Sequence, residues 1–346
     1  MEVAMELQLV NRNMLPVPLM ATKPSVADDV EIVEVLDEPK TDSSRSFIEA
    51  NTLDVTLEHL RNDCIIPVFR DNEKTISHYE FINAVDLATR EHFGDSGLLP
   101  AQIRVSHPIN GRIPSALHKK VHELEDFEKT RYYERMMFAI EIPSISETVH
   151  GNRLNLTIGG VRALNHESLF SRKSIEKFKV FIGFQNKVCT NLSVSTDGVM
   201  LDLRISSIME LIEKVFELFS RFNIPQNLRM LSNFGNYSLT EHQFAQVIGR
   251  SRLYQYLPAA QKKEVPMLEF NDTQINMVAR DYYHDKSFCK SGNGDINLWR
   301  LHNLFTGANR NSYIDAFLSR ALNATTFTQG IASALDGDPR YQWFLS

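Results

Sequence analysis

A basic and aromatic segment in the last third of the chain has the composition of a binding surface. It reads Gly249-Arg-Ser-Arg-Leu-Tyr-Gln-Tyr256 and precedes the pair Lys262-Lys263. Each of its two arginines lies four positions before a tyrosine, so on a helix they form adjoining columns of guanidinium and aromatic groups. Guanidinium groups contact phosphates and aromatic rings stack on bases, which suits single-stranded DNA or RNA. The nucleic-acid-binding residues predicted by this pattern are Arg250, Arg252, Tyr254, Tyr256, Lys262 and Lys263.

A purely structural explanation of this segment stays open, because basic residues also stabilise helix C-termini and tyrosines can simply pack. The charge of the whole chain bears on the choice. Residues 1–60 carry twelve acidic and four basic side chains, which leaves 31 acidic and 33 basic ones in residues 61–346. This nearly neutral body argues against a protein that coats nucleic acid by charge alone, but it allows a local basic groove.

Two sets of carboxylates are further candidates for chemistry. Asp281, His284 and Asp285 would lie together on a predicted helix, where they could supply part of a metal site or form a polar helix end. Glu141 lies on the polar side of a predicted strand, where it could act as a general base or simply face solvent. Neither pattern is specific enough to assign a catalytic residue, and we expect neither a bound metal nor a cofactor.

The common catalytic motifs are absent from the sequence. There is no GxGxxG after a predicted strand, and no GxxxxGK[ST], HExxH or GxSxG. These absences argue against dinucleotide enzymes, P-loop NTPases, zincins and α/β-hydrolases. The three cysteines, Cys64, Cys189 and Cys289, are far apart and form no CxxC pair. We therefore expect thiols in a reducing cytosol rather than a zinc site or a disulfide framework.

The elements that must position these residues follow from hydrophobic periodicity. Apolar residues alternate with others in the strand-rich region 101–205, most clearly at 137–142, 154–158, 178–182 and 199–205. Short turns between these segments indicate a largely antiparallel sheet. A capping box at Thr240-Glu-His-Gln243 predicts a helix that runs to about Leu257, and further helices are expected near 271–286, 296–306 and 311–335. The fold class is therefore α+β, with the sheet in the N-terminal and central part and a helical C-terminal part.

Composition divides the chain into three regions. Residues 1–46 are rich in proline and acid, which predicts a poorly ordered acidic arm, although Val30–Leu36 could order on a partner. Residues 47–205 form the α+β sheet region, and residues 206–346 form the helical region packed on the sheet. Acidic Glu2 and Glu6 do not fit a secretory signal, and no apolar run approaches the ~20 residues of a membrane helix. We expect a cytoplasmic protein with no membrane partner.

Two stretches resemble a known family. One is Asn152-Arg-Leu-Asn-Leu-Thr-Ile-Gly-Gly-Val-Arg162, which continues to Phe178-Lys-Val-Phe-Ile-Gly-Phe-Gln-Asn-Lys-Val-Cys-Thr-Asn191. The other is Ile296-Asn-Leu-Trp-Arg-Leu-His-Asn-Leu-Phe-Thr306. Their order and spacing resemble an uncharacterised family from mobile elements of gut Bacteroides-type bacteria, domain of unknown function thirty-eight seventy-one, over roughly residues 47–345. The Val-Cys-Thr-Asn and Trp-x-x-x-Asn-x-x-Thr segments are more distantly similar to the phage/plasmid-like protein group. The resemblance implies a cargo gene of conjugative transposons, plasmids or prophages, with no known activity and no assigned catalytic residue.

Three functional hypotheses remain at this level. The first is an accessory protein of a mobile element that binds nucleic acid in single-strand handling, recombination or replication. The second is an inhibitor that binds a host protein, with the acidic arm mimicking nucleic-acid charge. The third is an enzyme with an unrecognised site near Glu141 or Asp281–Asp285. They differ in what they require of the surface: a positive groove, an exposed apolar patch, or a pocket with converging carboxylates or histidines.

Overall fold

The computed structural model describes residues 46–64, 66, 75–95, 97–116, 118–167 and 175–346. All of these belong to one compact unit, residues 44–346. Of the predicted acidic arm, only Ser46 falls within the described residues, and the segment Val30–Leu36 lies outside them.

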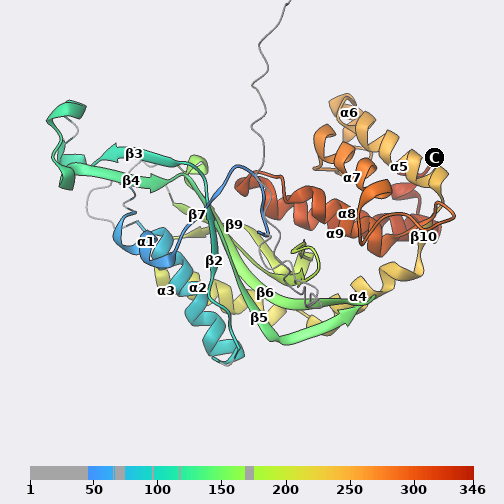
Figure 1. Cartoon of the computed structure of the whole chain (residues 1–346), viewed down its shortest axis with the longest axis horizontal. Coiled ribbons are helices and arrows are strands. Elements are labelled where there is room, and N and C mark those ends of the chain that lie inside the picture. Colours follow the sequence, from blue (N-terminus) through green and yellow to red (C-terminus); the bar gives the residue numbers. More distant parts are fainter. Residues whose placement is uncertain (1–45, 65, 67–74, 96, 117, 168–174) are drawn as a thin grey trace, which may run out of the picture. The chain divides into compact units, whose positions relative to one another are not determined.

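A seven-stranded antiparallel sheet forms the centre of the described residues, as Figure 1 shows. Its spatial order is β1-β2-β5-β6-β7-β8, and β9 pairs with β7. The α+β class, with the sheet in the N-terminal and central part, is confirmed, since all four predicted strand segments lie in strands. The strands are β1 (Leu53–Asp54), β2 (Gln102–Val105), β5 (Arg135–Val149), β6 (Asn152–Ala163), β7 (Glu176–Asn186), β8 (Leu192–Ser193) and β9 (Val199–Ile205).

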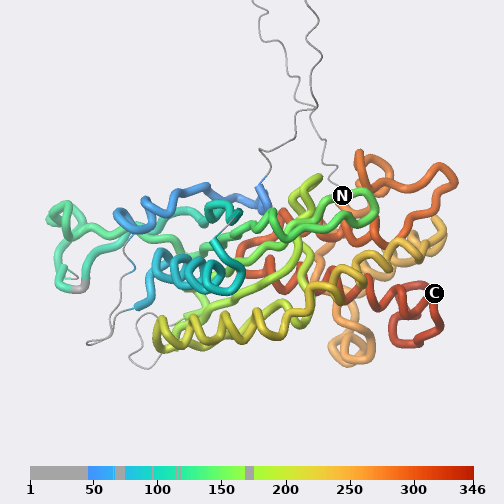
Figure 2. Tube along the Cα trace, turned by 90° about the horizontal axis from the view of Figure 1, so that it is seen from below, coloured from blue at the N-terminus to red at the C-terminus, as the bar shows by residue number. Residues whose placement is uncertain are grey.

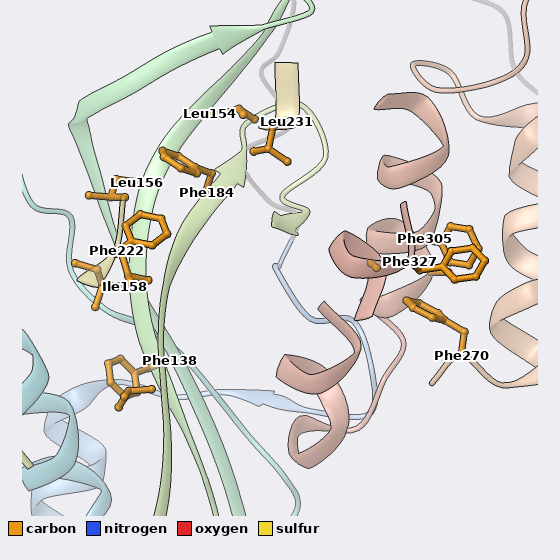
Figure 3. Packing of buried hydrophobic residues seen from close by; sticks show 14 of the residues in the cluster. Phe138, Leu154, Leu156, Ile158, Phe184, Phe222, Leu231, Phe270, Phe305 and Phe327 are labelled. Carbon is orange, nitrogen blue, oxygen red and sulfur yellow. The ribbon is translucent and has the colours of Figure 1, made fainter. Parts of the chain in front are cut away.

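One face of the sheet packs against three helices. Alternate residues such as Phe138, Leu156 and Phe184 are buried there. Figure 3 shows Leu156 and Phe184 near Phe222 and Leu231, with Phe138 farther along the strands. Helix α2 begins with a capping box at Ser77, which satisfies two backbone N–H groups at its start. The helices are α2 (His78–Phe93), α3 (Ile208–Arg221) and α4 (Ile224–Asn233), and the short α1 (Leu57–Asn62) packs on α2.

The opposite face of the sheet has a smaller core of its own. Met137, Val161 and Phe181 point to this side, where the first half of α9 (Ile314–Leu335) packs against them. Phe47 and Ile48, close to the start of the described residues, complete the same core and are almost fully buried. The sheet is therefore buried on both faces along part of its length, which explains why its strands carry apolar residues at successive positions.

Tandem glycines in β6 allow close contacts on both faces. A Cβ atom at Gly159 would collide with the backbone carbonyl oxygen of Phe138 and with the ring of Phe181. One at Gly160 would collide with the ring of Phe81 from α2 and with the carbonyl oxygen of Lys179. The two glycines alternate in direction, so each admits an aromatic ring on its own side of the sheet. The space that a side chain would need at each glycine is thus taken by an aromatic ring and by the backbone of a neighbouring strand.

The helical part follows the sheet in the chain. Its core contains Phe270, Phe305 and Phe327, which Figure 3 shows close together among the helices. The predicted capping box at Thr240 is present, but the helix ends at Tyr254, three residues before the expected end. The elements are α5 (Glu241–Tyr254), α6 (Ala259–Lys262), α7 (Asp272–His284), α8 (Leu298–Asn309), α9 and the 3-10 helix Pro339–Phe344, with a small sheet of β10 (Ser238–Leu239) and β11 (Ile296–Asn297).

A two-stranded ribbon forms a separate sheet that the sequence did not predict. It consists of β3 (Pro108–Arg112) and β4 (Lys129–Tyr133), joined by 3-10 turns that include Val121–Glu123 and Asp126–Glu128. Figures 1 and 2 show the ribbon at one end of the described residues and helices α5–α7 at the other. Among the described helices, none has the length and apolar character needed to cross a membrane.

Candidate functional site

The structure separates the residues of the predicted nucleic-acid surface into buried and exposed groups. Tyr254 is 7% exposed and belongs to the core, where its ring lies near that of Phe344. Tyr256, just beyond the end of α5, is 79% exposed. Of the two tyrosines, only Tyr256 therefore presents its ring for stacking on a base.

The two arginines of α5 have different partners. Arg252 Nε lies 2.7 Å from Oδ1 of Asp272, the first residue of α7, and both side chains are partly exposed. Arg250 donates from Nε to the backbone carbonyl of Ser346 over 2.8 Å, and its guanidinium lies 5.0 Å from the centre of the Trp343 ring. Arg250 thus has its aromatic partner in Trp343 near the C-terminus, which the four-residue spacing could not reveal.

The two lysines lie at the end of α6, the short helix that follows α5. The ammonium group of Lys262 lies 5.2 Å from the ring of Tyr254 and donates to the carbonyl of Gln255 over 3.1 Å. Lys263 is exposed, and Leu253 on the last turn of α5 is 56% exposed. We use the name α5 face for Arg250, Arg252, Leu253, Tyr256, Lys262, Lys263 and Trp343. The two arginines are two positions apart on the helix, so they project to different sides of α5, Arg250 toward Trp343 and Arg252 toward Asp272 of α7.

The carboxylates of Asp281 and Asp285 make local contacts at the C-terminal end of α7. Asp281 pairs with Arg280 at 2.7 Å, and the side chain of Asp285 accepts from the backbone N–H groups of Ser287 and Phe288. In the part of the chain that the structure describes, no group of three or more His, Cys, Asp or Glu side chains could hold a metal ion. The local geometry therefore matches a polar helix end with a following turn.

Glu141 does not face solvent, contrary to the structural alternative considered for it. The residue is 3% exposed, and its carboxylate accepts from Nδ2 of Asn155. The Nζ atom of Lys187 lies 2.9 Å from each carboxylate oxygen. Glu141 is thus a buried charge that is compensated by a half-exposed lysine, as buried carboxylates generally require.

A row of polar side chains surrounds Glu141 on the same face of the sheet. Thr157 lies directly opposite Glu141, and Gln185 lies directly opposite Asn155, so all four point to one side. All four are at most 3% exposed. We call Glu141, Asn155, Thr157, Gln185 and Lys187 the sheet-end cluster. Oδ1 of Asn155 has no hydrogen-bond partner among the described residues.

The turn that follows β7 connects the sheet to α8. Thr190 in this turn has φ of 57°, a left-handed conformation that is uncommon for a β-branched residue. Its hydroxyl donates to the carbonyl of Ser46, and Arg310 after α8 donates to the carbonyl of Cys189 over 3.0 Å. Asn186 and Asn191, which flank the turn, both hydrogen-bond to Asn303 of α8. The two stretches singled out in the sequence therefore meet in space.

Helix α8 brings two unusual buried groups to this junction. Nε1 of Trp299 and Nδ1 of His302 are both buried without a hydrogen-bond partner among the described residues. Burial lowers the pKa of His302 to about 3, so its imidazole is neutral at ordinary pH. Nε2 of His302 contacts the hydroxyl of Thr325, which lines a small pocket together with Ser193 and Asn227. The pocket has a volume of about 10 Å³, which is room for about one water molecule and far less than a small-molecule site needs.

Comparison with known families accounts for nearly the whole chain. The family described as "Domain of unknown function, B. Theta Gene description (DUF3871)" matches residues 26–345. The chain belongs to this family. No curated protein and no solved structure matches it. The DUF3871 match includes the sheet-end cluster, the turn after β7 and the α5 face, so each of these is part of the family's domain.

Proposed function

We propose that this DUF3871 protein is an accessory protein of a bacterial mobile genetic element that binds single-stranded nucleic acid through the α5 face. The observation that carries the proposal is the 79% exposed ring of Tyr256, which lies in a segment with four basic and no acidic residues between 250 and 263. A base stacked on such a ring contributes about 1–3 kcal/mol, with little sequence preference.

The arrangement around Arg250 supports the same proposal. Its guanidinium lies over Trp343 while its Nε is bonded to the backbone of Ser346, so the group is held in place at the protein surface. A guanidinium fixed in this way loses less rotamer freedom when it contacts a phosphate. Because the body of the protein is close to neutral, the α5 face has to supply most of the attraction, and binding should weaken steeply with salt.

The charge contribution can be tested by fluorescence anisotropy with a labelled single-stranded oligonucleotide and its duplex, at 50 and 200 mM NaCl. The double variant Arg250→Ala with Arg252→Ala should lose detectable binding and keep its circular dichroism spectrum. The matched control is Arg204→Ala with Lys214→Ala, which removes two exposed cations from β9 and α3. Wild-type protein that does not bind at 50 mM NaCl, or a double variant that binds as tightly as wild type, would overturn the proposal.

The stacking contribution needs a separate pair of variants. Tyr256→Ala should weaken binding about 5- to 150-fold, since loss of one stacked base costs about 1–3 kcal/mol. Tyr313→Ala is the matched control, because Tyr313 before α9 is 70% exposed and lies outside the α5 face. Equal affinities of the two variants would show that Tyr256 does not stack on the ligand.

The mobile-element context rests on the resemblance of the segments around 152–191 and 296–306. An accessory role predicts that deleting the gene from its element reduces transfer or maintenance of that element while the host grows normally. Complementation with the Arg250→Ala, Arg252→Ala variant should fail if nucleic-acid binding is the function that matters. Normal transfer without the gene would contradict this part of the proposal.

A further inference from the structure

The ion pair between Arg252 and Asp272 places a carboxylate where the proposed function needs a phosphate. Arg252 donates from Nε to Oδ1 of Asp272 over 2.7 Å and from Nη2 to Oδ2 over 3.4 Å. A guanidinium also binds a phosphate through two parallel N–H···O bonds. The carboxylate of Asp272 and a strand phosphate therefore compete for the same donors of one arginine.

The two members of this pair depend on it unequally. Among the described residues, Arg252 hydrogen-bonds to no group other than Asp272. Asp272 has further contacts, since its backbone N–H donates to Oε1 of Gln255 over 3.0 Å and its Oδ2 accepts from Nδ2 of Asn276 over 3.3 Å. It is also the first residue of α7, where the helix N-terminus favours a negative charge. Asp272 therefore keeps stabilising contacts when Arg252 turns to another anion.

The exposure of the pair determines how easily it opens. The side chains of Arg252 and Asp272 are 52% and 37% exposed to solvent. Ion pairs with this exposure change an equilibrium by only about 1.5- to 5-fold. A strand phosphate can therefore replace the carboxylate, with a loss of affinity of that size.

Arg250, the other arginine of α5, has no such competitor. Its Nε donates to the carbonyl of Ser346, and its guanidinium lies over the ring of Trp343. Neither contact is made by a side-chain carboxylate. The two arginines therefore differ in how they meet a phosphate, since Arg250 contacts it directly and Arg252 has to exchange one anion for another.

We propose that Asp272 is an internal competitor of the bound strand and regulates the affinity of the α5 face through Arg252. This inference rests on the proposed function and adds to it a residue outside the α5 face. In the free protein the carboxylate holds Arg252, and in the complex a strand phosphate takes its place. The exchange keeps binding weaker than the cations alone would make it. It also reduces the dependence on salt, because the freed carboxylate takes up a cation while the phosphate releases one.

The substitution Asp272→Asn tests the competition, with fluorescence anisotropy of a labelled single-stranded oligonucleotide at 50 and 200 mM NaCl. Asparagine keeps the size of the side chain, and circular dichroism checks that the fold is retained. At 50 mM NaCl the variant should bind at least twofold more tightly than wild type. The slope of log affinity against log salt concentration should steepen by up to about 0.7, the value for one more neutralised phosphate on a single strand.

Two comparisons separate the competition from a general effect of charge. Glu264→Gln removes an exposed carboxylate next to Lys263 that has no ion-pair partner among the described residues, so it should raise the affinity less than Asp272→Asn does. In an Arg252→Ala background, the gain from Asp272→Asn should shrink to that of Glu264→Gln. Equal gains from the two carboxylate variants, or an undiminished gain without Arg252, would overturn the inference.

The inference and the proposed function can fail separately in this experiment. Wild-type protein that binds the oligonucleotide with the same affinity as Asp272→Asn overturns the competition and leaves nucleic-acid binding in place. Binding by Asp272→Asn without binding by wild type supports the competition and contradicts the function as proposed. If neither protein binds at 50 mM NaCl, the proposed function is wrong and the inference falls with it.

Discussion

The side-chain amide of Asn186 donates to Oδ1 of Asn303 over 3.1 Å, although 117 positions separate the two residues. Asn303 also donates from Nδ2 to the carbonyl of Trp299, and its own carbonyl accepts from Nδ2 of Asn191 over 2.9 Å. A single asparagine of α8 therefore binds both ends of the turn that follows β7 and connects the helical part to the sheet.

Replacing Asn303 should destabilise the fold because its partners are buried. Asn303→Ala removes the acceptor of the buried Asn186 amide and the donor to the carbonyl of Trp299, whereas the bond from Asn191 goes to the backbone carbonyl and is kept. The loss should cost roughly 1–3 kcal/mol in the free energy of unfolding. Urea denaturation measures this change. Asn276→Ala, on an exposed position of α7, is the control and should change the free energy by less than about 0.5 kcal/mol.

The pair formed by Glu141 and Lys187 should be coupled. Lys187→Met leaves a buried carboxylate without its cation and should lower the free energy of unfolding by about 1–3 kcal/mol. This loss is smaller than for a fully buried pair because the lysine is half-exposed. In a Glu141→Gln background the same lysine change should cost less than about 0.5 kcal/mol, because no charge is left to compensate. Equal costs in the two backgrounds would show that the pair contributes nothing.

Two neutral histidines should make the protein acid-sensitive. Burial is the main cause that lowers the pKa of His78 and of His302 from 6.5 to about 3. The unfolded chain therefore binds protons that the folded chain does not, so stability is full above about pH 6.5 and falls as the pH drops toward 3. In that window, each histidine lowers the free energy of unfolding by up to about 1.4 kcal/mol for each unit by which the pH falls.

The contribution of His302 can be measured from how steeply stability changes with pH. This slope can be compared between wild type and a variant even when their stabilities at neutral pH differ. Urea midpoints between pH 7.5 and 5 should fall less steeply for His302→Gln than for wild type, even if the variant is less stable overall. An unchanged slope in His302→Gln would mean that this histidine is already charged in the folded state.

The cap of α5 should contribute measurably to stability. Thr240 accepts from the backbone N–H of Gln243 and the side chain of Gln243 accepts from the N–H of Thr240. Thr240→Ala should cost about 1 kcal/mol, whereas Thr240→Ser keeps the hydroxyl and should cost a few tenths. Indistinguishable urea midpoints for the two variants would show that the hydroxyl does not cap the helix.

Two truncations test how much of the N-terminal region the fold needs. Deleting residues 1–43 should barely move the thermal midpoint, because their proline and acid content leaves little apolar surface to bury. Deleting residues 1–50 also removes Phe47 and Ile48 from the second core and should lower the midpoint by many degrees. A loss of several degrees from the shorter deletion would show that a segment before residue 44 is integral to the fold.

Local patterns predicted the elements well, because their causes are local. Alternation located the strands around Phe138, Ile158 and Val180, and the capping box located the start of α5 to the residue. Helices near 271–286, 296–306 and 311–335 followed from apolar periodicity and are present as α7, α8 and α9. Each of these signals depends on neighbours within a few positions in the sequence.

The environment of single side chains depended on distant segments and could not be read from spacing. Tyr254 and Tyr256 each follow an arginine by four positions. Tyr254 is nevertheless buried near Phe344 from the C-terminal 3-10 helix, whereas Tyr256 is exposed. Glu141 alternates with apolar residues like a solvent-facing group, but Lys187 from the end of another strand reaches it. The ribbon carries no clear alternation, and only its fold reveals Phe127 as exposed.

The second core described above has a consequence for synthesis on the ribosome. Its sheet residues, from Met137 to Val199, emerge more than a hundred residues before Ile314, Phe317 and Leu318, which cover them. During that interval the strands can pair, but one apolar side of the nascent sheet has no helix to bury it. Chaperones that bind exposed apolar strands would therefore act in this window, and translation that stalls before α9 would release an aggregation-prone chain.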